Sequence, residues 1–128
     1  DSTLKGQTVF LAERCAELMN NDIITDRTVI DVMAFTMNAK SIGHYDKEIF
    51  ESYAKEFIRE YDYIFYISPH GIPMEDNGVR ETDEHYRDII DFTITTLIKK
   101  YGHMANKIEK ISGSTDERVE QILKFTNL

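Results

Sequence analysis

The stretch Tyr63-Ile64-Phe65-Tyr66-Ile67 decides the fold class, because it is apolar at every position and rich in residues that favour β-strands. A surface strand of an antiparallel sheet would alternate apolar and polar residues. A continuous apolar run is typical of a central parallel strand that helices cover on both faces. We therefore expect an α/β protein built around this strand.

Upstream of this run, the spacing of apolar residues predicts one strand among three helices. We expect a helix over residues 8–20 and a short strand over residues 22–26. Thr28 is expected to cap the next helix together with Asp31, three residues further on. Asp46 is expected to cap the helix after that.

Downstream of this run, prolines and glycines mark one long loop over residues 69–82. A long helix is expected from there to about residue 101, followed by a strand over residues 107–112. Ser114 and Glu117 have the spacing of a capping box, which predicts a last helix.

Strands that alternate with helices form parallel βαβ units. We therefore expect residues 1–128 to form a single domain with a three-stranded parallel sheet between two layers of helices. Such a domain usually starts with a strand, whereas this chain opens on a helix. We accordingly expect the 128 residues to be the C-terminal portion of the domain, with its first strand upstream of Asp1.

The composition bounds the function. The chain has 15 Lys and Arg against 23 Asp and Glu, a net charge of −8, which disfavours non-specific binding to nucleic acid. Its apolar stretches are far shorter than the roughly 20 residues that cross a bilayer. With Cys15 as the one cysteine, no internal disulfide can form. We expect a cytoplasmic protein without a nucleic-acid or membrane partner.

Polar residues that directly follow the predicted strands are the first candidates for a site, because ligands of open α/β sheets bind beyond the carboxyl ends of the strands. Asp26 and Arg27 follow the first strand. A carboxylate there can accept a proton from a substrate hydroxyl, and a guanidinium can hold a phosphate. The alternative is an Asp–Arg ion pair that braces the turn into the helix.

The loop over residues 69–82 is the second candidate, since it follows the central strand. It contains Arg80, and Arg87 comes soon after it. A lid that closes over phosphates needs a hinge and a positive charge. The alternative is a solvated surface loop.

The third candidate is the junction before the last helix, where Gly113 and Ser114 precede the helix and Arg118 could reach back. Backbone N–H groups at such a junction suit a phosphate or the edge of a purine. The alternative is simple helix capping. The histidines have no metal-ligand spacing, so we predict no metal site among the side chains.

Four segments, in order along the chain, resemble P-loop nucleoside-kinase-like proteins, which are AAA-type ATPase domains related to ribosylnicotinamide kinase and deoxynucleoside kinases. Residues 25–31 (TDRTVID) resemble the DR[ST]-x2-D segment of that family, and residues 61–67 (YDYIFYI) its strand before the lid. Residues 72–83 (IPMEDNGVRETD) are similar to its lid, and residues 111–119 (ISGSTDERV) to its closing segment.

The resemblance implies a P-loop NTPase-like fold that transfers the γ-phosphoryl group of ATP, with Mg²⁺, to a nucleoside-like small molecule. By resemblance, Asp26 would orient or deprotonate the acceptor hydroxyl, and Arg27 would contact the acceptor or the phosphates. Arg80 and Arg87 would be lid charges on the γ-phosphate.

By the same resemblance, Gly113 and Ser114 would border the adenine, with Arg118 beside them. The family's G-x-x-x-x-G-K-[ST] phosphate loop does not occur in these 128 residues. We therefore expect this chain alone to be inactive and the complete protein to be the kinase. The alternatives are a non-catalytic nucleotide-binding or regulatory module and a structural domain. A homodimer is left open.

Overall fold

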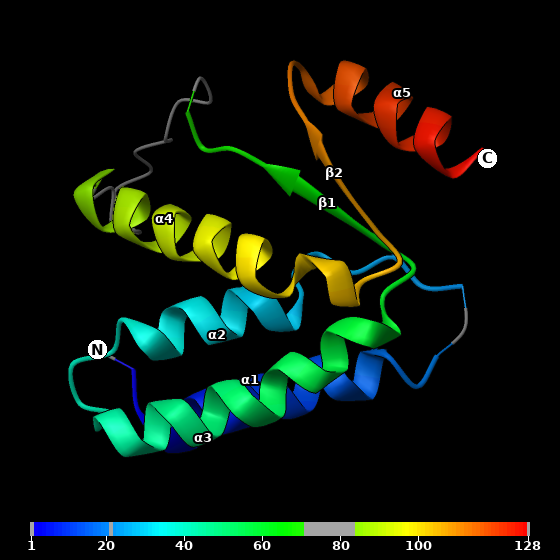
Figure 1. The fold of residues 1–128 in the computed structure, drawn as a ribbon. Helices are drawn as coiled ribbons and strands as arrows, with labels where there is room; N and C mark the ends of the chain where they lie inside the picture. The colour runs from blue at the N-terminus through cyan, green and yellow to red at the C-terminus, as the bar shows by residue number, and fades with distance from the viewer. Residues whose placement is uncertain (1, 21, 71–83, 128) are drawn as a thin grey trace.

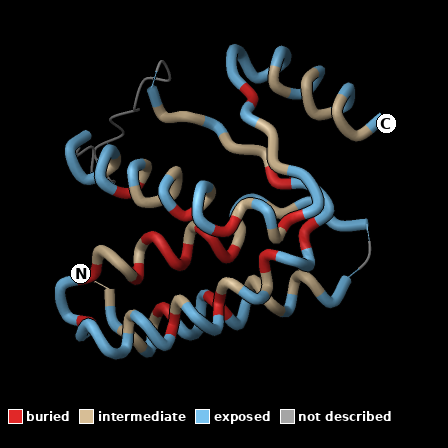
Figure 2. The backbone as a smooth tube through the Cα atoms, viewed as in Figure 1, coloured by how far each residue is buried: buried red, intermediate tan, exposed pale blue. Residues whose placement is uncertain are grey.

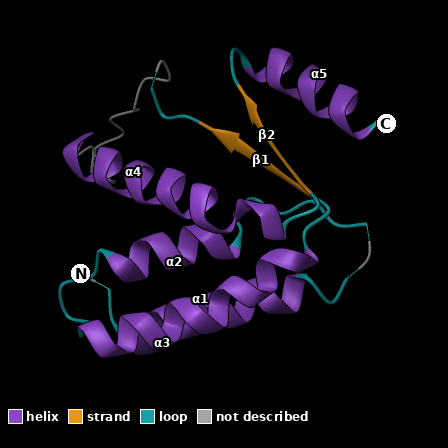
Figure 3. Cartoon of the chain, viewed as in Figure 1, coloured by secondary structure: helices purple, strands orange, loops and turns teal. Residues whose placement is uncertain are grey.

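The computed structural model describes residues 2–20, 22–70 and 84–127, and it is a mixed α/β structure in which helices dominate (Figures 1 and 3). The helices in chain order are α1 (Leu4–Glu17), α2 (Val29–Met37), α3 (His44–Ala54), the 3₁₀ helix η1 (Lys55–Glu60), α4 (Glu84–Tyr101), the 3₁₀ helix η2 (Gly102–Met104) and α5 (Thr115–Thr126). The strands are β1 (Tyr63–Ile67) and β2 (Lys107–Ile111).

The sheet of the described residues consists of β1 and β2, which pair in parallel from Tyr63 beside Lys107 to Ile67 beside Ile111. Both strands and their parallel direction are therefore confirmed. α4 lies on one face of the pair, and α5 lies on the other (Figure 1). The rings of Phe65 and Phe125, 6.4 Å apart, join β1 to α5.

The predicted strand over residues 22–26 is wrong, and the sheet of the described residues has two strands instead of the three expected. Asp22 has φ 55°, in the left-handed region that interrupts an extended chain. Ile23 and Ile24 are 43% and 92% exposed, so they pack against little. Residues of high β-propensity form a strand only where another strand pairs with them and one of their faces is buried. Among the described residues, Ile23 and Ile24 have neither a strand partner nor a buried face.

The core lies among the helices rather than around the sheet. α2 is its centre, since Val29, Met33 and Ala34 are each 0% exposed and α2 packs against α1, α3 and α4 (Figure 2). By contrast, Ile64 is the one buried residue of β1, and Ile67 is 43% exposed. The expectation of a strand fully covered on both faces is therefore wrong.

The N-cap residues determine where four of the helices begin. Thr28 and Ser114 cap α2 and α5 in capping boxes, as predicted. α1 begins at Leu4 instead of residue 8, because Thr3 accepts a hydrogen bond from the N–H of Gly6 at 3.0 Å. Asp46 lies in the first turn of α3, where Gly43 is the N-cap.

Candidate functional site

The residues that follow β1 and β2 leave the sheet at the same edge. Because Ile67 and Ile111 end the two strands side by side, residues 68–70 and 112–114 both start from that edge. This is the edge at which open parallel sheets bind ligands. Most of the predicted lid, residues 71–82 with Arg80, lies outside the described residues.

Two carboxylates of α4 face the end of β1. The Tyr66 hydroxyl donates a hydrogen bond to Asp91, and His70 Nε2 lies 3.9 Å from Asp88 Oδ1. Burial and the hydrogen bond to Asp91 raise the pKa of Tyr66 to about 12. Asp88 and Asp91 were not predicted as site residues. Their spacing of three on one face of a helix is the signal that could have found them.

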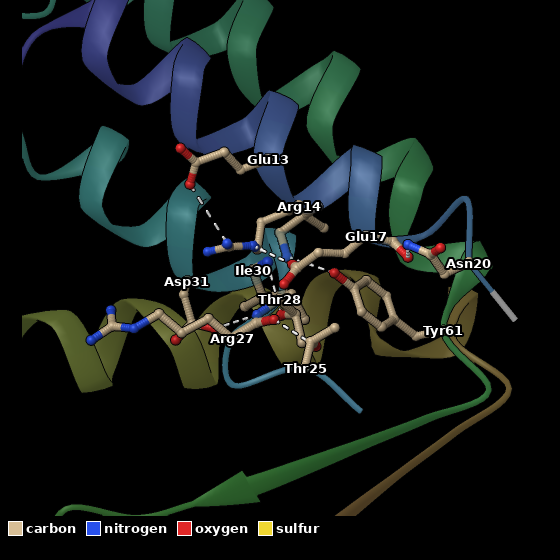
Figure 4. Close-up of polar contacts among 11 residues, drawn as sticks. Glu13, Arg14, Glu17, Asn20, Thr25, Arg27, Thr28, Ile30, Asp31 and Tyr61 are labelled. Atoms are coloured by element: carbon tan, nitrogen blue, oxygen red, sulfur yellow. Dashed lines mark hydrogen bonds and ion pairs between the residues drawn. The ribbon is translucent and has the colours of Figure 1, made fainter. Parts of the chain in front are cut away.

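Arg27 lies directly before Thr28, the N-cap of α2, whose first turn is fixed by hydrogen bonds (Figure 4). The N–H of Val29 donates to the Tyr61 hydroxyl at 3.2 Å, and the N–H of Ile30 donates to the Thr28 hydroxyl at 3.1 Å. The first donors of the helix are thus satisfied, which fixes the backbone that carries Arg27.

The Arg27 side chain extends away from Tyr61 (Figure 4) and places its guanidinium 5.7 Å from the centroid of the Phe35 ring. The Phe35 ring lies 6.4 Å from the ring of Tyr86 in the first turn of α4. These two ring contacts join Arg27, Phe35 and Tyr86 in one surface group. Asp26 is exposed, and no ion pair joins it to Arg27 in the part of the chain that the structure describes.

The described arginines fall into two groups. Arg14 and Arg59 form ion pairs with glutamates of their own helices. Arg27, Arg87 and Arg118 have no carboxylate partner among residues 2–20, 22–70 and 84–127. Within the same ranges the buried Nε of Arg87 has no hydrogen-bond acceptor. In a protein of net charge −8, these three are among the four arginines that the sequence assigned to a site, and the fourth, Arg80, lies outside the described residues.

Side chains of α5 hold the junction between β2 and α5. Gly113 has φ +100° and so lies in the left-handed region. Arg118 donates to the carbonyl of Gly113 at 2.7 Å, so its side chain reaches back to the junction. The Gln121 amide accepts from the N–H of Ser112 at 3.1 Å and donates to its carbonyl at 2.7 Å. Gln121 had no sequence signal, since its partner lies nine residues away.

The predicted residues thus form two groups. Arg27 lies with Phe35 and Tyr86, whereas Gly113, Ser114 and Arg118 lie at the end of β2. Arg87 lies in the first turn of α4, one residue after Tyr86. Among the described residues no hydrogen bond or ion pair joins Arg27 or Arg87 to Gly113, Ser114 or Arg118.

A separate pocket of about 260 Å³ lies between α3 and the end of α4, away from the sheet edge. Burial alone would raise the pKa of Glu51 in this pocket, but hydrogen bonds from Lys100 and Tyr101 outweigh it and lower that pKa. Lys100 Nζ lies 2.8 Å from Glu51. The charges of the pocket largely neutralise one another, so it offers no selective binding feature.

The side chains of the described residues contain no group of three or more His, Cys, Asp and Glu that could hold a metal ion. The described helices are also too short or too polar to cross a membrane. Comparison with protein-family models, with curated proteins and with solved structures gave no match to this chain.

Proposed function

We propose that this chain supplies the acceptor-binding and lid part of an ATP-dependent kinase that phosphorylates a nucleoside-like metabolite. The observation that carries the proposal is the set of unpaired arginines. Among the described residues Arg27, Arg87 and Arg118 have no carboxylate partner, whereas Arg14 and Arg59 form ion pairs within their helices. Phosphoryl transfer depends on such cations to offset the charge of the moving group.

The surface around Phe35 and Tyr86 suits the acceptor. The two rings offer apolar faces, with interplanar angle 38°, beside the Arg27 guanidinium. A flat, uncharged ring gains by stacking on such faces, and the guanidinium can hold a neighbouring oxygen of the acceptor. Asp26, exposed and without a partner arginine, would orient or deprotonate the acceptor hydroxyl.

The proposal requires a phosphate-binding segment outside these 128 residues, since the G-x-x-x-x-G-K-[ST] loop does not occur in them. Among the described residues no group of three or more His, Cys, Asp and Glu could hold a metal ion by itself, and the Mg²⁺ of a kinase is held mainly by substrate phosphates and waters with one or two carboxylates. We therefore assign the metal no step here. The second candidate, a non-catalytic nucleotide-binding module, is favoured by the same observation.

Binding of the acceptor is tested by titrating the ¹⁵N-labelled chain with a panel of nucleosides. We expect at least one nucleoside to shift the amide signals of Arg27, Phe35, Tyr86 and Arg87, and Arg27→Gln to weaken that binding about tenfold, as expected for a lost charged hydrogen bond. Arg59→Gln is the control, because that arginine already pairs with Glu56. If the two variants bind alike, the acceptor does not use Arg27.

Release of ADP by the complete protein, measured with ATP, Mg²⁺ and the nucleoside that binds, separates the two candidate functions. For a kinase, we expect Asp26→Asn to lower kcat about 10²- to 10⁴-fold, the range for a lost general base, with little change in ATP affinity. Unchanged turnover would remove Asp26 from the chemistry. Binding without ADP release would favour the non-catalytic module.

A further inference from the structure

A row of large side chains on α3 is left uncovered by the rest of the fold. Tyr45, Ile49 and Tyr53 are spaced by four residues, which places them on one side of the helix, and they are 73%, 49% and 61% exposed. The core takes another side of α3, where Phe50 and Ala54 are buried. α3 itself lies at the border of the molecule (Figure 1). The row therefore contributes little to the core.

Helix formation and polar contacts do not account for these side chains either. Ile and Tyr favour a helix less than Ala, Glu or Lys, so an exposed helix gains nothing from them. Among the described residues, the hydroxyls of Tyr45 and Tyr53 make no hydrogen bond, and the Tyr53 ring meets that of Phe57, 5.3 Å away. Single exposed apolar side chains are ordinary, but a contiguous row with two tyrosines is typical of a protein-binding surface.

The geometry of the row fits a second copy of the same chain. The row is symmetric about Ile49, with one tyrosine four residues before it and another four residues after it. A two-fold axis at Ile49 therefore sets Ile49 against Ile49, and Tyr45 of each copy against Tyr53 of the other. Rows with a spacing of four are also the ridges that interlock in the commonest class of helix–helix packing.

The exposed area of the row is large enough to matter for such a pairing. At about 150–250 Å² for one aromatic side chain, the exposed fractions of Tyr45 and Tyr53 correspond to roughly 200–330 Å² per copy. Two copies would thus bury roughly 400–670 Å² from these side chains alone, about a third to a half of the smallest specific interfaces. Ile49 and the flanking residues of α3 add to this area, so we expect a weak dimer.

The charges beside the row favour a second copy over a basic partner. Glu56 forms an ion pair with Arg59 at 3.7 Å, and Glu48 lies 2.9 Å from His44 Nε2. These contacts occupy carboxylates that a basic partner would need, and they reduce the local repulsion between two copies. The remaining repulsion comes from the net charge of −8 on each copy, which salt screens.

We propose that the face of α3 formed by Tyr45, Ile49 and Tyr53 is the contact between two copies of this chain in a two-fold symmetric dimer. The inference does not rest on the proposed function, because none of these three residues belongs to the candidate site. Nucleoside binding and dimer formation therefore succeed or fail independently.

The experiment follows the mass of the full chain by analytical ultracentrifugation, at protein concentrations from about 10 μM to about 1 mM. We expect a change from monomer to dimer over this range. Ile49→Glu is expected to weaken the association at least about tenfold, because it sets two carboxylates against each other at the two-fold axis. Ile49 is half-exposed and Glu favours a helix, so the circular dichroism spectrum should stay unchanged. Leu123→Glu is the matched control, since Leu123 on α5 is 44% exposed.

Salt and crosslinking test the nature and the register of the contact. Added salt screens the repulsion between the copies, so we expect it to tighten an apolar dimer. In a Cys15→Ala background with oxidised glutathione, Ile49→Cys should form a disulfide between copies and Leu123→Cys should not.

Three results would each overturn the inference. The first is a wild-type chain that stays monomeric at the highest concentration or a dimer that salt dissociates, since ion pairs would then hold the copies together. The second is equal association of Ile49→Glu and Leu123→Glu. The third is an Ile49→Cys variant that stays unlinked, because the two-fold axis would then not pass through Ile49.

Discussion

The hydrogen bond between the Val29 N–H and the Tyr61 hydroxyl provides a sharp test of how the candidate site is supported. Val29 is the first residue of α2 and lies two residues after Arg27. Its N–H is one of the donors that a helix cannot satisfy internally, and a side chain 32 residues away supplies the acceptor at 3.2 Å. The substitution Tyr61→Phe removes that acceptor and keeps the ring.

The size of the expected loss in the free energy of unfolding follows from the burial of Tyr61 and Val29. Tyr61 is 7% exposed and Val29 is 0% exposed, so water cannot easily replace the phenol oxygen. A buried donor left without an acceptor costs about 1–3 kcal/mol in the free energy of unfolding. With an unfolding entropy of about 0.27 kcal/mol/K for a chain of this length, that loss lowers Tm by about 4–11 °C.

Urea unfolding followed by circular dichroism measures the change, with Tyr53→Phe as the matched control. Tyr53 is 61% exposed, so its substitution is expected to change the free energy of unfolding by less than about 0.5 kcal/mol. Equal, small effects of the two substitutions would refute the reasoning, because they would mean that Tyr61 does not hold the start of α2.

Two further predictions concern pH and capping. Burial is the main cause that raises the pKa of both Tyr61 and Tyr66 to about 12, above about 10 for an unfolded chain. Their protonated forms therefore stabilise the fold fully below pH of about 10, and this contribution is lost as the pH rises towards 12. Urea midpoints should fall over that window, and less steeply in Tyr61→Phe; an equal slope in the variant would contradict the assignment. Gly43, the N-cap of α3, makes no side-chain cap bond, and a Cβ there would meet nothing within 4 Å. Gly43→Ser should therefore raise the free energy of unfolding by about 0.5–1 kcal/mol, and a loss of stability in the same urea assay would show that the cap does not form.

The features predicted correctly from the sequence are those that depend on residues close together in the chain. The capping boxes at Thr28 and Ser114 are confirmed, because each needs only a partner three residues away in the chain. The run over residues 63–67 does form a strand, parallel to residues 107–111. The arginines named from their place after predicted strands or within the lid region include all three that lack a carboxylate partner among the described residues.

Interactions between residues that are distant in the chain could not be predicted from local sequence patterns. The short apolar pair Ile23-Ile24 looks like a strand locally, yet no strand among the described residues pairs with it. Asp91 accepts a hydrogen bond from Tyr66, and Gln121 accepts one from Ser112, because the fold brings each pair together. Sequence spacing does not encode which residue will stand opposite another across two packed elements.

The amino-acid sequence by itself determined where most helices and both strands form, since apolar periodicity and caps act within a few residues of the chain. Tertiary structure alone decided that the core gathers around α2, that the sheet has two strands in the described part of the chain, and that Arg27 lies over Phe35 beside Tyr86. The physical reason is that packing and pairing depend on surfaces that distant segments bring together.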